Sequence, residues 1–162
     1  VMAMALTLLQ MQSQERALYL FDTFSGMTAP SEIDIDYMGQ PAETILEDIR
    51  CVASQEEVEA AVFSTNYDPA NIHFVKGPVE ETIPAHAPGT ISLLRLDTDW
   101  YQSTRHELFH LFPRVAPGGV IIVDDYGHWQ GARQAVDEYL AQHRISLLLH
   151  PIDYTGRIGV KA

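Results

Sequence analysis

The sequence predicts an α/β fold with a mostly parallel sheet. Short apolar runs of strand length alternate along the chain with stretches that repeat apolar residues at helical spacing. Some of these runs are apolar at every position, which is typical of parallel strands buried on both faces. The last two runs are joined by a short turn, so we expect the sheet to end in an antiparallel hairpin.

The first part of the chain predicts one strand and three helices. Residues 1–9 are apolar, but the run has no basic leader, no cleavage site and too little length to span a bilayer, which favours a buried helix. A capping-box spacing at Ser54 marks another helix start. In order, we expect a helix, a strand, a long loop and two helices, at residues 1–9, 17–21, 23–40, 41–50 and 54–64.

The remainder of the chain predicts five strands and two longer helices. Residues 130–143 repeat apolar side chains every three or four positions, as in an amphipathic helix. We expect a turn at 116–119, where the sequence is Ala-Pro-Gly-Gly. The expected strands are 72–76, 91–96, 120–123, 145–150 and 157–161, and the expected helices are 103–112, 130–143 and a short piece within 77–84.

Size and composition indicate a single domain over residues 1–162. The chain is 46% hydrophobic, enough for one core and too little for two comfortable ones. Lys and Arg number 10 against 22 Asp and Glu, and the formal charge of −12 repels phosphate backbones and anionic lipids. We therefore expect neither nucleic acid nor a membrane as a partner. The single cysteine, Cys51, indicates a reducing, cytoplasmic compartment, and we expect its side chain to be buried.

Two acidic clusters follow neighbouring strands. Asp97 and Asp99 come after strand 91–96, and Asp124 and Asp125 come after strand 120–123. Because one helix joins the two strands, the crossover brings both strand ends to one edge of the sheet, where open α/β sheets carry their chemistry. Carboxylates gathered there repel one another unless a cation lies between them, and hard oxygen ligands favour Mg²⁺ or Ca²⁺ over Zn²⁺. The sequence therefore predicts a metal site.

Four ordered blocks, at residues 18–27, 74–84, 94–104 and 117–133, carry a family resemblance over almost the whole chain. They resemble the macrocin O-methyltransferase family. These are class I methyltransferases that depend on S-adenosylmethionine and Mg²⁺ and methylate sugar hydroxyls, often on antibiotics. The resemblance implies a Rossmann-like sheet with a carboxyl-terminal antiparallel hairpin, a hydroxylated, sugar-containing small-molecule acceptor and a homo-oligomer.

The resemblance also implies a role for each acidic residue at these strand ends. Asp97, Asp124 and Asp125 are the implied Mg²⁺ ligands, and the base is either Asp97 or Asp99. A hydroxyl chelated by the cation loses its proton more readily, which explains why such a reaction uses a metal ion. His128 either assists proton transfer or is a solvent-facing or capping histidine.

By the same resemblance, S-adenosylmethionine lies at two other strand ends. Asp22 resembles the acidic residue that accepts both ribose hydroxyls, although a turn cap is the alternative interpretation. Gly77 resembles the glycine that lets the backbone approach the adenine. The residues implied in cofactor binding are Asp22, Thr23, Phe24, Gly77, Pro78 and Val79.

Other aromatic and histidine residues have two interpretations each. Trp100 and Tyr101 form either the floor of an acceptor pocket or a packed helix start. His106 and His110 have the spacing of a helical metal pair, but no third ligand completes it, which favours surface histidines.

One departure from the family pattern affects the cofactor. Class I methyltransferases carry a first strand and a glycine-rich turn before the helix that begins here at Val1, and neither is present. That strand lies between the strands ending at Asp22 and Asp97, and its absence leaves backbone groups unpaired. We therefore expect either a fragment of a longer polypeptide or another chain or segment in the gap. From these residues alone we expect cofactor binding to be weak or lost.

Two other functions stay open at this point. One is a different metal-dependent Rossmann-like enzyme, such as a hydrolase, and the other is a non-catalytic binding or oligomerisation module. Binding of S-adenosylhomocysteine that depends on Asp22 would distinguish a methyltransferase from both.

Overall fold

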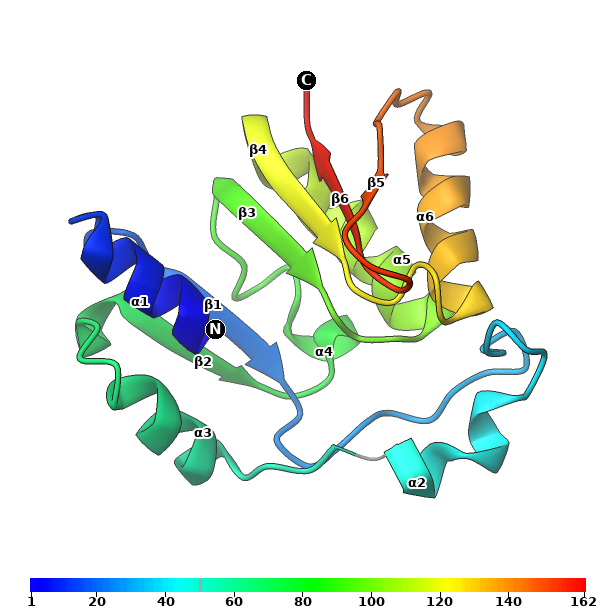
Figure 1. Ribbon diagram of the computed structural model, residues 1–162, viewed down its shortest axis with the longest axis horizontal. Helices are drawn as coiled ribbons and strands as arrows, with labels where there is room; N and C mark the ends of the chain where they lie inside the picture. Colours follow the sequence, from blue (N-terminus) through cyan, green and yellow to red (C-terminus); the bar gives the residue numbers. More distant parts are fainter. Residues whose placement is uncertain (50) are drawn as a thin grey trace. The chain divides into compact units, whose positions relative to one another are not determined.

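The computed structural model describes residues 1–49 and 51–162 (Figure 1). These residues form two compact units. The first comprises residues 1–27 and 51–82, and the second comprises residues 28–49 and 83–162. Each unit has a sheet and helices of its own, and the single domain stays a prediction.

A two-stranded parallel sheet lies in the first unit. Strand β1 (Leu18–Asp22) pairs with β2 (Ile72–Lys76), in the register that sets Asp22 beside Lys76. The backbone N–H of Gly77 donates to the Asp22 carbonyl at 2.9 Å. The pairing therefore brings the ends of the two strands, and the loops that follow them, together.

The helices of the first unit agree with the predicted ones. Helix α1 (Met2–Gln10) has no side-chain cap, and only its Ala5 is buried, so this helix is covered on one side only. Helix α3 (Gln55–Phe63) begins with the predicted capping box. Helix α4 (Val79–Thr82) and the 3₁₀ turn η2 (Pro69–Asn71) complete the unit. Its core consists of Ala5, Leu20, Val62, Tyr67 and Ile72.

The second unit contains a four-stranded mixed sheet, in the order β3-β4-β6-β5. Strand β3 (Ile91–Leu96) is parallel to β4 (Val115–Val123). Strand β6 (Arg157–Val160) is antiparallel to β4 and also to β5 (His150–Pro151), which confirms the predicted hairpin. Within the described residues, no strand pairs with both β1 and β3.

Two helices pack against each other in the second unit. Helix α5 (Tyr101–Leu111) is the predicted crossover between β3 and β4, and it contacts α6 (Gln130–Gln142) (Figure 1). The predicted apolar stripe on α6 is confirmed, because Ala132, Val136 and Tyr139 are buried. Shorter elements are α2 (Leu46–Ile49), η1 (Ala42–Thr44) and η3 (Phe112–Arg114). None of the helices described is both long and apolar enough to cross a membrane.

The predicted turn at 116–119 is wrong, because these residues belong to β4. Ile91 pairs with Val115 and Leu93 with Val120, so the extra residues of β4 form a bulge. Gly118 lies in this bulge with a φ of +77°, a conformation that favours glycine. The Ala-Pro-Gly-Gly segment therefore bends the strand without ending it.

Three other boundaries differ from the predictions. Of the expected strand 145–150, only His150 belongs to the observed strand β5, which continues to Pro151, and Leu148 is 84% exposed. The expected helix at 41–50 is broken into η1 and α2, and its end at Arg50 lies outside the described residues. Cys51 is exposed because α2 ends before it, so the prediction of a buried thiol is wrong.

Candidate metal centre at the ends of two parallel strands

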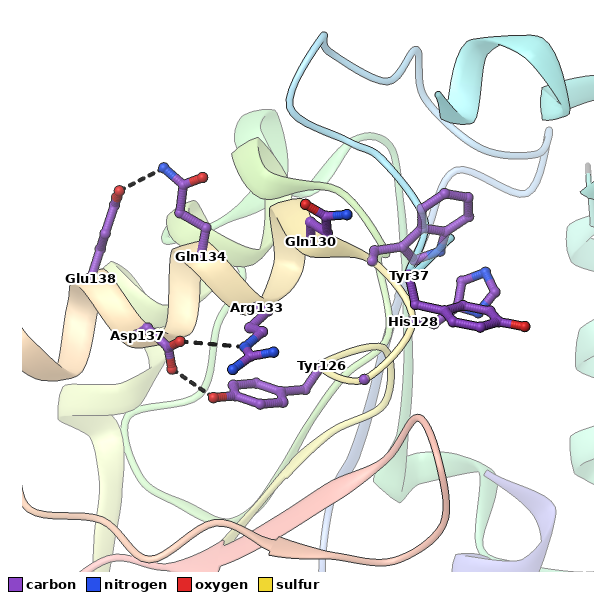
Figure 2. Close-up of a pocket in the computed structure, with 10 residues that line it drawn as sticks. Tyr37, Tyr126, His128, Gln130, Arg133, Gln134, Asp137 and Glu138 are labelled. Atoms are coloured by element: carbon purple, nitrogen blue, oxygen red, sulfur yellow. Dashed lines mark hydrogen bonds and ion pairs between the residues drawn. The ribbon is translucent and has the colours of Figure 1, made fainter. Parts of the chain in front are cut away.

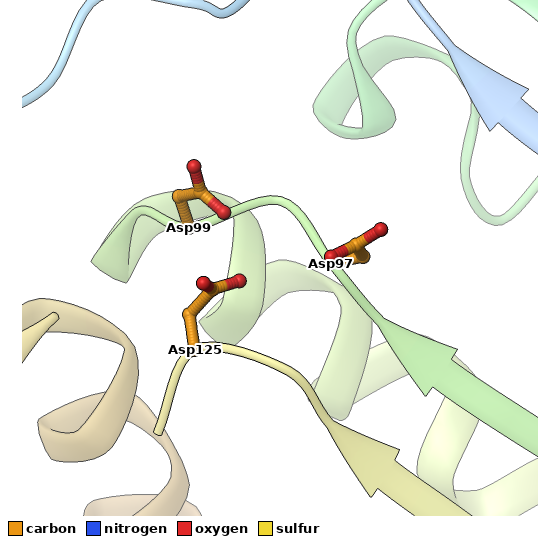
Figure 3. Close-up of side chains that lie close together, drawn as sticks. All are labelled: Asp97, Asp99 and Asp125. Atoms are coloured by element: carbon orange, nitrogen blue, oxygen red, sulfur yellow. The ribbon is translucent and has the colours of Figure 1, made fainter. Parts of the chain in front are cut away.

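Three carboxylates converge where β3 and β4 end (Figure 3). Asp97 follows β3 directly, Asp99 lies two residues further on, and Asp125 follows β4. One oxygen from each carboxylate lies within 4.8 Å of the others. Oxygen atoms at this spacing can share one divalent cation. The convergence of Asp97 and Asp125 agrees with the sequence, and the third member of the group is Asp99.

The loop that carries Asp97 and Asp99 is held by a buried carboxylate. Asp99 has a φ of +65°, which is uncommon for a residue other than glycine and persists only where the surroundings enforce it. The Thr98 hydroxyl donates to Glu107 Oε2 at 2.9 Å, and Glu107 is 5% exposed. Glu107 of α5 therefore holds the loop in its strained conformation, next to the three convergent carboxylates.

Arg95 partly neutralises this edge of the sheet. Its Nη1 lies 2.5 Å from Asp97 Oδ2, and its Nη2 lies 3.0 Å from Asp124 Oδ1. The guanidinium group thus binds two of the carboxylates predicted as metal ligands. Asp124 is outside the group of three convergent residues, and its role as a ligand stays a prediction.

Burial and mutual repulsion disfavour the charges of the three convergent carboxylates. Burial and a hydrogen bond with Asp124 raise the pKa of Asp97 to about 7, although Arg95 opposes the shift. Burial and a hydrogen bond with Asp99 raise the pKa of Asp125 to about 8. Burial also raises the pKa of Asp99. Groups that resist ionisation in this way become readily charged beside a cation.

One oxygen of the cluster has no hydrogen-bond donor. Asp125 Oδ2 is buried, and among the described residues it accepts no hydrogen bond. Buried carboxylate oxygens normally accept hydrogen bonds or bind a cation, because an unsatisfied one is costly. The residues present therefore fit a hard divalent ion.

The first three predicted cofactor residues form one turn after β1. The Asp22 side chain is exposed, and its Oδ1 accepts the Phe24 N–H at 2.8 Å, which is the turn-cap interaction. The Thr23 hydroxyl donates to the Gly26 carbonyl at 2.5 Å. Phe24 is 6% exposed with a φ of +54°. Asp22 is thus anchored through one oxygen and open to solvent, an arrangement that fits a diol acceptor.

The other three predicted cofactor residues lie beside this turn, after β2. Gly77 has a φ of +136°, and a Cβ there would lie 3.1 Å from Thr82 Cγ2, so the position favours glycine. The Pro78 carbonyl accepts backbone N–H groups of α4, and Val79 is 5% exposed. The structure therefore brings Asp22 and Gly77 together, as their predicted shared role requires.

Two aromatic residues named in the sequence pack at the start of α5. Trp100 is 2% exposed, and its Nε1 donates to the Thr28 carbonyl at 2.9 Å, which favours the packed helix start. The Tyr101 hydroxyl donates to Glu138 Oε2 at 2.7 Å.

The histidines occupy different surroundings. His128 follows the acidic cluster, and its Nδ1 lies 3.1 Å from the Tyr154 hydroxyl. His106 contacts a backbone carbonyl, that of Ile83, at 3.0 Å. The participation of His128 in proton transfer stays a prediction.

The sequence did not reveal Asp34, which is 1% exposed and organises the second unit. Its Oδ1 accepts the Tyr101 N–H at 2.7 Å and so caps α5, while its Oδ2 accepts from the backbone and hydroxyl of Ser31. A Cβ at Gly131 of α6 would lie 2.0 Å from Asp34 Oδ1. Only the Ser-x-x-Asp spacing in a loop without periodicity could have indicated this role.

Carboxylates at the ends of parallel strands, in an α/β sheet with a final antiparallel hairpin, agree with a class I methyltransferase fold. The solved structure titled "Structure of the O-methyltransferase NovP" has this fold, with a TM-score of 0.85 and 28% identity over 99% of this chain and 66% of that one. The chain belongs to the macrocin-O-methyltransferase (TylF) family, whose family model matches residues 1–159. The predicted family and fold class are therefore confirmed.

Two curated relatives are O-methyltransferases of Streptomyces species. The chain is 33% identical, over 145 residues, to demethyldecarbamoylnovobiocin O-methyltransferase of Streptomyces niveus, covering 88% of this chain and 54% of that protein. It is 32% identical, over 143 residues, to 8-demethyl-8-(2,3-dimethoxy-alpha-L-rhamnosyl)-tetracenomycin-C 4'-O-methyltransferase of Streptomyces olivaceus, covering 87% and 53%. The chain thus spans about half the length of these relatives. The calicheamicin methyltransferase CalS11, at 22% identity and a TM-score of 0.62 over 91% of this chain and 61% of that one, shares the fold.

Proposed function

We propose that the protein transfers a methyl group from S-adenosylmethionine to a hydroxyl group of a sugar-containing secondary metabolite, with Mg²⁺ at the acidic cluster. The convergence of Asp97, Asp99 and Asp125 at the strand ends of a methyltransferase fold carries this proposal. The names of the relatives support the acceptor class, since one of them methylates a rhamnosyl group. We also propose a homo-oligomer, and we propose a cytoplasmic location on the basis of the single cysteine.

The proposed cation ligands are Asp97 and Asp125, with Asp124 as the predicted third. Bound Mg²⁺ would lower the pKa of an acceptor hydroxyl and fix its position. Asp125 would contribute the buried oxygen that has no hydrogen-bond donor among the described residues. Asp124 would join the site by exchanging its ion pair with Arg95 for the cation.

We propose Asp99 as the base that accepts the proton of the acceptor hydroxyl. Burial raises the pKa of Asp99, and a higher pKa makes a carboxylate a stronger base. Asp97, whose pKa is about 7 in the metal-free chain, is the poorer candidate because contact with the cation would lower its basicity. His128 would then receive the proton or pass it to solvent.

Asp22 and Gly77 would hold the cofactor. The Asp22 carboxylate would accept the ribose hydroxyls, and the backbone at Gly77 would lie against the adenine, flanked by Thr23, Phe24, Pro78 and Val79. The cofactor, when bound, supplies the electrophilic methyl group. The shared loop geometry after β1 and β2 supports this assignment.

A labelled methyl transfer assay tests the proposal. The protein is incubated with S-adenosylmethionine labelled at the methyl group and with methyl α-L-rhamnopyranoside, in Mg²⁺ or in chelator. We expect transfer only with Mg²⁺, and a loss of about a hundredfold or more in Asp97→Asn and Asp125→Asn, since each removes a cation ligand.

Two controls make the assay decisive. Asp48→Asn removes an exposed carboxylate on α2 and should leave the rate unchanged. Calorimetric titration with S-adenosylhomocysteine, in the parent protein and in Asp22→Ala, reports cofactor binding separately. Equal transfer in chelator would refute the role of Mg²⁺, and neither transfer nor S-adenosylhomocysteine binding would refute the methyltransferase.

A further inference from the structure

Three aromatic rings from separate segments meet in the second unit. Tyr37 comes from the loop before η1, His128 from the segment between β4 and α6, and Tyr154 from the turn between β5 and β6. The ring centroids of Tyr37 and His128 are 5.5 Å apart, and both lie 6.0 Å from that of Tyr154. We call these three residues the aromatic cluster.

The two tyrosine rings of this cluster are largely exposed to solvent. Tyr37 is 60% exposed and Tyr154 is 66% exposed, whereas Trp100 and Trp129 of the same unit are 2% and 3% exposed. Adjacent aromatic rings held at the surface are typical of ligand-binding sites, because a tyrosine offers both an apolar face and a hydroxyl. Their exposure therefore requires an explanation other than core packing.

Backbone hydrogen bonds fix the turn that carries Tyr37. Asp36 is 7% exposed, and its Oδ1 accepts the N–H groups of Met38 and Gln40, both at 2.8 Å. The Gln130 side chain donates to the Asp36 carbonyl at 2.8 Å and ties this turn to the start of α6. The backbone at Tyr37 is therefore held in place without a ligand.

The turn that carries Tyr154 is fixed just as closely. Asp153 Oδ1 accepts the N–H groups of Thr155 and Gly156 at 2.9 and 2.7 Å. The Gly127 N–H donates to the Thr155 carbonyl at 2.8 Å, and a Cβ at Gly127 would lie 1.9 Å from the Tyr154 carbonyl oxygen. This close approach holds Tyr154 beside His128, whose Nδ1 pairs with its hydroxyl.

The aromatic cluster adjoins the acidic group of the proposed active site. The backbone N–H of His128 donates to the Asp125 carbonyl at 3.0 Å, so one turn carries a residue of each group. Tyr37 and His128 line a cavity of about 500 Å³ together with Tyr126 and Arg133, and Figure 2 shows these side chains around the first turns of α6. The cluster and the acidic group are therefore joined through the turn of Asp125 and His128, and the cavity beside Tyr37 and His128 leaves room for a substituent.

We propose that the aromatic cluster binds the pyranose ring of the acceptor and presents its hydroxyl to the acidic group. This inference rests on the proposed function and deepens it. The C–H face of a pyranose packs on exposed aromatic rings, while the Tyr37 and Tyr154 hydroxyls and the imidazole of His128 match its hydroxyl groups. Because the turns that carry Tyr37 and Tyr154 are held by hydrogen bonds without a ligand, binding requires little ordering of the backbone.

Saturation-transfer NMR with simple glycosides tests this proposal. The probes are methyl α-L-rhamnopyranoside and methyl α-D-glucopyranoside, with 1,2-propanediol as a non-pyranose diol. We expect the protein to saturate the ring C–H protons of at least one glycoside, and the dissociation constant to rise about tenfold in Tyr37→Ala and in Tyr154→Ala. Tyr37→Phe keeps the ring and should retain most of the affinity.

Phe109→Ala is the matched control, because Phe109 is an aromatic residue of α5 that is likewise 60% exposed. Circular dichroism shows that each variant is folded, and Mg²⁺ titration shows that the acidic group is intact. Unchanged affinity in both tyrosine variants, or binding of neither glycoside, would overturn the proposal that the aromatic cluster binds a pyranose ring.

The same experiments separate this inference from the proposed function. Equal methyl transfer by the parent protein and by both tyrosine variants would support the methyltransferase function and refute the role of the aromatic cluster in binding the acceptor. Glycoside binding that depends on Tyr37, in a protein without methyl transfer, would refute the proposed function and support a sugar site.

Discussion

Asp125 gives the metal-free protein an expected dependence on pH. Its pKa is about 8 in the folded chain against 3.8 for an ordinary aspartate, so between these values the folded state holds a proton that the unfolded state has lost. Stability must then fall as the pH rises through this window. Asp97, with a pKa of about 7, adds to the effect.

We therefore expect the melting temperature in chelator to fall between about pH 4 and about pH 8, and the fall to be smaller in Asp125→Asn. Thermal melts across this range measure it. Added Mg²⁺ should raise the melting temperature most at the alkaline end, because the cation offsets the repulsion there. A parent protein that becomes more stable through the window would contradict the raised pKa values.

Arg95 competes with a cation for the same carboxylates. It holds Asp97 and Asp124 through separate nitrogens, so a bound ion must displace part of this pairing. We expect Arg95→Gln to bind Mg²⁺ about threefold more tightly or better, because the local charge becomes more negative. The metal-free variant should also melt at a lower temperature, since the carboxylates lose their counter-charge.

Isothermal titration with Mg²⁺ measures this effect. Arg133→Gln is the control, because Arg133 forms an exposed pair with Asp137 at 3.7 Å on α6 and does not contact Asp97 or Asp124. Weaker Mg²⁺ binding by Arg95→Gln would show that Arg95 organises the site and does not compete for it.

Between elements, the close contact of α5 with α6 depends on Gly131. A Cβ there would meet Asp34 Oδ1 at 2.0 Å, and Asp34 cannot withdraw without losing its bonds to Ser31 and Tyr101. We expect Gly131→Ala to lower the free energy of unfolding by about 1–3 kcal/mol, as overpacking does. Urea denaturation gives the value.

Gly89 provides the control for this prediction. A Cβ at Gly89 would meet no atom within 4 Å, so Gly89→Ala should change the free energy of unfolding by about 0.5 kcal/mol or less. If the two variants are equally stable, the Asp34 contact does not limit helix packing.

Across the whole molecule, each compact unit has core residues of its own. Val62 is 2% exposed in the core of the first unit, and Val62→Ala leaves a cavity there that costs about 2 kcal/mol. We expect hydrogen exchange to quicken in β1, β2 and α3, while α5 and α6 keep their protection. Amide exchange by mass spectrometry resolves these segments, and equal loss of protection in both units would show that they unfold together.

The sequence predicted those parts of the molecule that follow from local pattern. Parallel pairing of two strands through one crossover helix was enough to bring Asp97 and Asp125 to one edge. The pairing of Arg95 with Asp124 depends on the register between strands, which the bulge at Gly118 alters. Asp34 lies in a loop without hydrophobic periodicity, so no such pattern in the sequence predicted its burial.

Convergence of distant loops was equally beyond the sequence. Tyr37 and Tyr154 lie far apart in the sequence. They meet because Gln130 holds the turn of Tyr37 at the start of α6 and because Gly127 contacts the turn of residues 153–156. Such contacts depend on tertiary packing, which the spacing of residues in the sequence does not predict.

The contact between Gly127 and the Tyr154 carbonyl also limits how this protein can be engineered. Any side chain at position 127 would force the neighbouring hairpin outward, so mutant libraries aimed at new acceptors should leave this glycine untouched. Diversity belongs at exposed Ile152 and Tyr154, whose turn can be exchanged for that of a relative while its glycine-facing carbonyl stays in place. The absence of a side chain at Gly127 therefore identifies the turn of Ile152 and Tyr154 as a place where a segment from a related protein can be joined.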